Sequence, residues 1–164
     1  IDNGIISSNL KKVSVSDNRF ERYLVQKNDI IISSKGTRIK IAVVNNIDDR
    51  KIVVNGNLLV LRIDTNRLNP YYLASYLNSS NGQATLKQVQ TGSVIISINP
   101  SSLIEMDIST FDIETQKKIA NKYLMKQKQY LIAKEHLKKI EEEYENYFDN
   151  EVLEMFQWEK KLIC

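Results

Sequence analysis

Short apolar runs separated by polar turn residues dominate the first part of the chain. Residues 30–33 (IIIS), 39–44 (IKIAVV), 51–54 (KIVV) and 58–63 (LLVLRI) are rich in β-branched and aliphatic side chains, which is typical of strands. The dipeptide Asn55-Gly56 lies between the last two runs and favours the tight turn of a hairpin. The pattern therefore predicts a small sheet in which residues 51–54 and 58–63 form a hairpin.

Helical spacing replaces the strand pattern after residue 68. Asn69 can cap a helix and Pro70 suits its first turn, and apolar side chains then recur at helical spacing through residue 77. A second short helix is predicted over residues 83–88, followed by strands over 94–98 and 104–108. Short strands mixed with short helices predict a compact α+β domain over residues 1–111.

A heptad pattern begins near Asp112, which can cap a helix whose body holds neither Gly nor Pro through Phe148. A seam of mostly apolar residues recurs there in steps of three and four, with Lys126 as the charged exception. The other seam residues are Ile119, Tyr123, Tyr130, Ala133, Leu137, Ile140, Tyr144 and Tyr147. Such a seam predicts a coiled-coil helix over residues 112–148, with a tail over 149–164. A helix folded back on its own domain is the alternative.

Composition narrows the class of protein. The one cysteine, Cys164, allows no disulfide within the chain, and no apolar stretch is long enough to span a membrane, so we expect a cytoplasmic protein without membrane contact. The chain starts at Ile1, so we expect a fragment or a processed form. Residues 11–40 hold 8 basic and 3 acidic side chains, which suits a surface that faces phosphates, although an ordinary solvated surface has the same composition.

Four segments, in order, resemble the target-recognition domain of type I restriction–modification specificity subunits. They are residues 25–37 (VQKNDIIISSKGT), 68–79 (LNPYYLASYLNS), 90–95 (QTGSVI) and 113–120 (IETQKKIA). The chain departs from the family at Asn28, where glycine is usual, and before the long helix, where the usual prolines are absent. Asparagine tolerates positive φ, so the turn at residue 28 is expected to survive.

The resemblance implies a non-catalytic DNA-recognition module. Each such domain reads one half of a bipartite target, and long helices set the spacing and hold adenine-N6 methyltransferase subunits. S-adenosylmethionine would then be bound by that partner or by a fused methyltransferase domain, and this chain would hold no cofactor. A single recognition domain also predicts a homodimer through the long helix or a larger parent chain.

Two polar segments offer groups for double-stranded DNA, because base edges are read by donors and acceptors and phosphates by cations. The predicted DNA-binding residues are Ser34, Lys35, Thr37, Arg38, Lys40, Gln88, Gln90, Thr91 and Ser93. Arg38 could bind a guanine, and Lys35 and Lys40 could bind phosphates. Further phosphate contacts are predicted at Lys11, Lys12, Arg19 and Arg22. Solvated loops are the alternative for all of these residues.

Two other classes of protein remain open on the sequence. Asp29 and Asp49 have a loose nuclease-like spacing for a metal ion, although short matches of this kind are common by chance. A protein-interaction module without DNA binding would use the long helix alone. The one histidine, His136, has no second histidine beside it and is expected at the surface, so no metal site is predicted.

Overall fold

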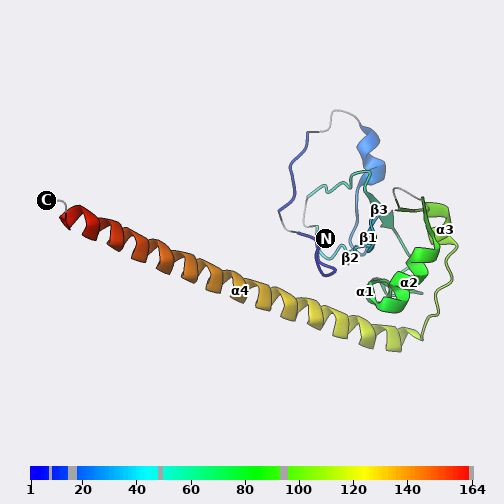
Figure 1. Ribbon diagram of the computed structural model, residues 1–164. Coiled ribbons are helices and arrows are strands. Elements are labelled where there is room, and N and C mark those ends of the chain that lie inside the picture. Colours follow the sequence, from blue (N-terminus) through cyan, green and yellow to red (C-terminus); the bar gives the residue numbers. More distant parts are fainter. Residues whose placement is uncertain (8, 15–17, 48–49, 93–95, 163–164) are drawn as a thin grey trace. The chain divides into compact units, whose positions relative to one another are not determined.

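The computed structural model describes residues 1–7, 9–14, 18–47, 50–92 and 96–162, without the side chains of residues 18, 19, 22, 150 and 153–162. The chain divides into a front unit, Ile1–Gln127, and a rear unit, Lys128–Cys164. Figure 1 shows the strands and short helices, which belong to the front unit.

The front unit is built on a three-stranded antiparallel sheet. Strand β1 (Ile30–Ser33) lies between β2 (Ile41–Val43) and β3 (Leu58–Leu61). Alternate side chains of β1 enter two apolar clusters: Ile30 and Ile32 belong to the main core, and Ile31 to a smaller cluster on the other side. Burial on both faces explains why β1 is apolar without alternation.

The predicted hairpin of residues 51–54 and 58–63 is wrong. The turn at Asn55-Gly56 is present, because the Leu58 amide donates to the Asn55 carbonyl at 3.0 Å. However, β3 pairs with β1 in the register Ile31 to Val60, while residues 51–54 lie along residues 23–25 through a bridge between Leu24 and Val53. Pairing with the central strand places β3 against the main core, which a local hairpin would not do.

Three short helices follow the sheet (Figure 1). They are α1 (Pro70–Asn78), α2 (Ser80–Gln88) and α3 (Pro100–Ile104). The predicted cap of α1 is confirmed, because Asn69 Oδ1 accepts from the amides of Tyr71 at 2.9 Å and Tyr72 at 3.2 Å. Helix α1 contacts α2 and β2, and thereby covers the main core.

The remaining short elements are a 3-10 helix, η1 (Asn18–Tyr23), and the antiparallel pair β4 (Gln90–Thr91) and β5 (Ser97–Ile98). Of the predicted strand 94–98, Ser97–Ile98 is confirmed, and residues 94 and 95 lie outside the described residues. The predicted strand 104–108 is wrong, because Ile104 ends α3 and residues 105–108 pair with no strand. Met106 and Ile108 nevertheless pack on the main core, which accounts for the alternating pattern.

The long helix is α4 (Ile113–Leu162), and it confirms the predicted start at Asp112. Asp112 Oδ1 accepts from the amides of Glu114 at 3.1 Å and Thr115 at 3.0 Å. The helix continues past Phe148 into the residues predicted as a tail. The structure is therefore α+β with one long C-terminal helix, as the sequence predicts.

The early seam residue Tyr123 is used by the front unit itself. It is 7 % exposed and belongs to the main core, and Gln116 and Ala120 on the same turns of α4 are also buried. Ile119 is half-buried. The later seam residues Ala133, Leu137, Ile140, Tyr144 and Tyr147 are all exposed. The first turns of α4 thus follow the folded-back alternative, and the open seam lies in the rear unit.

Candidate nucleic-acid interface

The two polar segments predicted to meet DNA lie against each other in the front unit. Gln90 Nε2 donates to the Gly36 carbonyl at 3.2 Å, and the Gly36 amide donates to the Ile96 carbonyl at 3.4 Å. A bridge between Lys35 and Ser97 extends the same contact toward β5. The loop after β1 and the turn after α2 therefore share one surface, although about 50 residues of sequence separate them.

A glutamine of α2 fixes the direction of the first loop. Gln83 Oε1 accepts from the Ile39 amide at 3.1 Å, and Gln83 Nε2 donates to the Ile39 carbonyl at 2.9 Å. Ile39 is 2 % exposed, while its neighbours Arg38 and Lys40 are exposed. Since side chains alternate along an extended chain, Arg38 and Lys40 project on the side opposite Ile39. Nothing in the sequence marks Gln83 for this role, because its partner is 44 residues away.

Most of the predicted contact residues are open to a ligand. The exposed ones are Lys35, Thr37, Arg38, Lys40, Gln88 and Thr91. Ser34 is 8 % exposed, and its Oγ has no hydrogen-bond partner within the described parts of the chain. Gln90 is half-buried and bonded to Gly36, so it joins the two segments. Ser93 lies outside the described residues.

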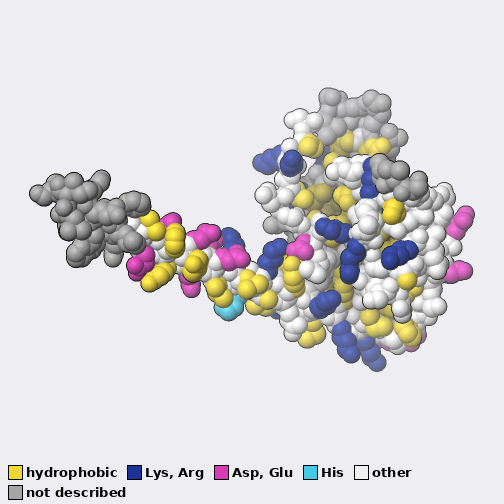
Figure 2. All heavy atoms as spheres, in the orientation of Figure 1, with side chains coloured by type: hydrophobic (Ala, Val, Ile, Leu, Met, Phe, Trp, Pro, Cys, Tyr) yellow, Lys and Arg dark blue, Asp and Glu magenta, His cyan; other side chains and the backbone are white. Residues whose placement is uncertain are grey.

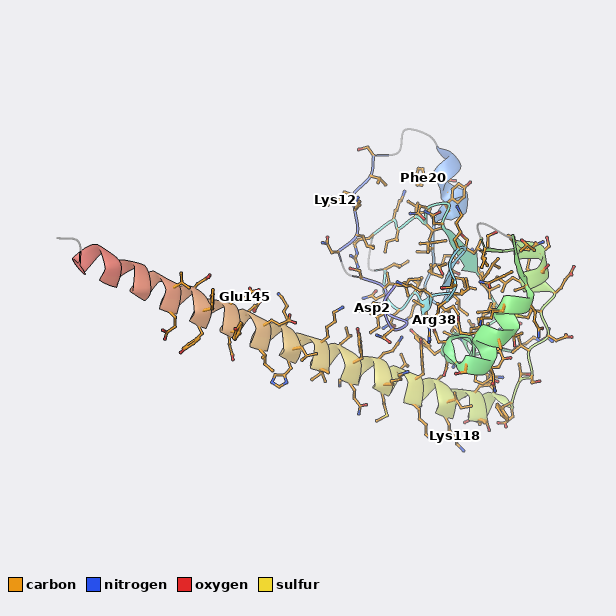
Figure 3. The ribbon with its side chains drawn as sticks, in the orientation of Figure 1. Asp2, Lys12, Phe20, Arg38, Lys118 and Glu145 are labelled. Carbon is orange, nitrogen blue, oxygen red and sulfur yellow. The ribbon has the colours of Figure 1, made fainter. Side chains whose placement is uncertain are left out.

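The predicted phosphate contacts nearer the N-terminus are described only in part. Lys11 and Lys12 are exposed, whereas the side chains of Arg19 and Arg22 lie outside the described set. Figure 2 shows lysine and arginine side chains spread over the drawn face of the front unit. Figure 3 labels two of the exposed cations, Lys12 and Arg38.

An N-terminal turn adds a feature that the sequence analysis missed. Asn3 and Gly4 both have positive φ (47° and 78°), and the Asp2 and Ile5 backbones exchange hydrogen bonds of 3.0 and 2.9 Å. Gln127 Nε2, on α4, donates to the Gly4 carbonyl at 2.7 Å. The Asn-Gly dipeptide was the available signal, and it indicates a tight turn here as it does at residue 55.

A hollow of about 330 Å³ opens beside this turn. Its lining residues are Ile1, Asp2, Asn3, Gly4, Arg38, Ile39, Lys40, Ile41, Asn78, Tyr123 and Lys126. Asp2 and Arg38, both labelled in Figure 3, line this hollow together. Asn78 Nδ2 donates to the Tyr123 hydroxyl at 3.1 Å, and burial raises the pKa of Tyr123, so the hydroxyl stays protonated at neutral pH.

Asp29, one of the two carboxylates of the nuclease alternative, forms an ion pair with Arg62. Asp29 is 1 % exposed, and Arg62 contacts it with two nitrogens at 2.7 Å each. The hydrogen bond from Arg62 to Asp29 raises the pKa of Arg62. Asp49 lies outside the described residues. Asp29 therefore holds β3 to the start of β1, a structural role.

The described residues offer neither a metal-binding cluster nor a membrane-spanning helix. No cluster of three or more His, Cys, Asp or Glu side chains there is arranged to hold a metal ion. His136 is exposed on α4. Within that same described part, no helix combines the length and the apolar character that crossing a membrane requires.

The front unit is thus an α+β domain in which the loop after β1 and the turn after α2 converge, and the long helix α4 follows. Residues 1–142 match the family model of the type I restriction modification DNA specificity domain. The chain belongs to this family, which confirms the resemblance found in the four sequence motifs. A search of curated proteins found no match. The chain is thus a DNA-specificity domain of type I restriction–modification, a recognition module rather than a catalytic one.

Proposed function

We propose that this chain reads one half of a bipartite DNA target through the loop after β1 and the turn after α2. The observation that carries the proposal is the hydrogen bond between Gln90 and Gly36, since it brings the two loops to one surface. Thr37, Gln88 and Thr91 are exposed beside that contact and carry the hydroxyl and amide groups that base edges can bind. Lys35 supplies a cation for the neighbouring phosphate.

Selection from a library of random duplexes tests this assignment. The wild-type chain, together with its partner methyltransferase, should enrich one half-site sequence. Gln88→Ala should relax the preference at one or two base pairs, because a bidentate amide contact discriminates bases by about 1–3 kcal/mol. The matched control is Gln129→Ala, an exposed glutamine of the rear unit, which should leave the selected sequence unchanged. Enrichment of the same sequence by the Gln88 variant would remove Gln88 from the base-reading surface.

The rear unit is proposed to bind a second helix along its open seam. Leu137 is 61 % exposed and Tyr144 is 68 % exposed, and large apolar side chains at this spacing favour helix–helix packing. The partner helix belongs to an adenine-N6 methyltransferase subunit, which would also bind S-adenosylmethionine, or to a second copy of this chain. The helix thereby sets the distance between the reading surface and the modifying enzyme.

A pair of charge substitutions separates the seam from the rest of the helix. Leu137→Glu should abolish co-purification with the methyltransferase, or reduce the mass in solution if a second copy is bound. Ile132→Glu is the matched control, because Ile132 is also exposed and apolar but lies outside the heptad seam. Equal effects of the two substitutions would contradict a seam-specific interface.

A further inference from the structure

Three cations from different parts of the front unit line the hollow beside the N-terminal turn. Arg38 and Lys40 come from the loop after β1, and Lys126 comes from α4. Asp2 is the one acidic residue of the lining. Within the part of the chain that the structure describes, none of the three cations takes part in a salt bridge. The lining thus carries a net positive charge, and its three cations form no ion pair with a described acidic side chain.

Hydrogen bonds hold the walls of the hollow, from which the three cations project, in place. The bonds from Gln83 hold Ile39 between Arg38 and Lys40. Asn78 Nδ2 donates to the Ile41 carbonyl at 3.1 Å and also to the Tyr123 hydroxyl, which joins β2 and α4. Preorganised walls reduce the entropy lost on binding.

We propose that this hollow is a phosphate-binding seat, in which Arg38, Lys40 and Lys126 together hold one phosphate group. Guanidinium and ammonium groups are the side chains that bind phosphate oxygens best, and Arg38 can do so with two parallel hydrogen bonds. A volume of about 330 Å³ exceeds one phosphate group and leaves room for the adjoining sugar or for water.

Where the phosphate belongs to duplex DNA, the seat is part of the proposed DNA recognition and rests on that proposed function. Free phosphate has the same chemistry and would be bound by the same three side chains. With DNA, the contact is independent of base sequence, so Arg38 holds the backbone in place of the guanine contact that the sequence predicted. The part of α4 that carries Lys126 then contributes to DNA binding, and it connects the reading surface to the rest of the long helix.

The first arm of the test measures duplex affinity against salt concentration for the full chain with its methyltransferase. Lys126→Ala should weaken binding to every duplex alike and lower the slope of log affinity against log salt by about 1. Lys128→Ala is the matched control: it removes the same charge from an exposed position about 200° around the same helix, and should leave the slope unchanged.

The second arm titrates inorganic phosphate into the chain alone and follows the backbone amide signals of Gly4 and Lys126 by NMR. Shifts in the wild type that Lys126→Ala abolishes support the seat, and an unchanged salt slope would then assign it to free phosphate. If Lys126→Ala keeps both the salt slope and the phosphate-induced shifts of the wild type, the proposal is overturned. A wild-type chain that binds no duplex at any salt refutes the proposed function, while the NMR titration still decides the seat.

Discussion

The three Asn-Gly dipeptides show how far one residue pair can determine local structure: those at residues 3–4 and 55–56 form turns, whereas Asn81-Gly82 lies within α2. At Asn3-Gly4 both residues have positive φ, whereas neither Asn55 nor Gly56 does. Of the two turns, only the one at Asn3-Gly4 is the close two-residue loop that the dipeptide favours most. The hairpin predicted at Asn55-Gly56 does not form, because turn residues specify a reversal and leave the pairing partner of each flanking segment open.

Gly4→Ala should destabilise the front unit. The backbone at Gly4 has φ of 78°, and an added Cβ would overlap the buried Tyr123 hydroxyl. We expect the free energy of unfolding to fall by about 2 kcal/mol, measured by chemical denaturation. Gly56→Ala is the control, because its Cβ would meet nothing within 4 Å, and its effect should stay within about 0.5 kcal/mol. Equal losses in the two variants would contradict this account.

Asp112 should make the start of α4 sensitive to acid. Hydrogen bonds from the Thr115 amide and hydroxyl, and from the Glu114 amide, lower the pKa of Asp112 below its ordinary value of 3.8. A lowered folded-state pKa means that the stabilisation is complete above the unfolded-state value and disappears as pH falls through the folded-state value. The Tm of the wild type should exceed that of Asp112→Asn at neutral pH, and the difference should shrink below about pH 4. A pH-independent difference would rule this out.

At the scale of elements, helices with local signals were predicted well and strand pairing was not. Asn69 and Asp112 mark the starts of α1 and α4 through bonds to amides two or three residues away. The partner of β3 is β1, about 30 residues earlier, and no local pattern specifies it. The end of α4 was also missed, since a helix without Gly or Pro carries no stop signal before Leu162.

Helix α2 provides a test in which packing and helix propensity change the stability in opposite directions. Gly82→Ala should gain about 1 kcal/mol from propensity. However, a Cβ at Gly82 would overlap the backbone of α1 at Tyr76 and Leu77, and overpacking against rigid backbone costs about 1–3 kcal/mol. We expect a net loss of stability in thermal unfolding, whereas the exposed neighbour Asn81→Ala should be neutral or slightly stabilising. A higher Tm for the Gly82 variant would show that α1 and α2 can separate without cost.

At the scale of the whole molecule, the candidate interface was predicted only in outline. The polar loop after β1 was recognisable from its cations, hydroxyl side chains and glycine, and the turn after α2 from its glutamines and glycine. Their contact through Gln90, and the contribution of Lys126 and Gly4 to the neighbouring hollow, depend on tertiary structure across much of the front unit. The family match to residues 1–142 adds the class of ligand, and the structure adds the surface proposed to meet it.

We propose above all that the front unit selects the DNA sequence that a methyltransferase modifies. Sequencing of modified adenines in cells with the intact gene and with the gene deleted tests it most directly. We predict that one bipartite methylation motif disappears on deletion and returns with an intact copy, and that Gln88→Ala relaxes one half of that motif only. Persistence of every adenine-methylation motif in the deleted strain would contradict the account.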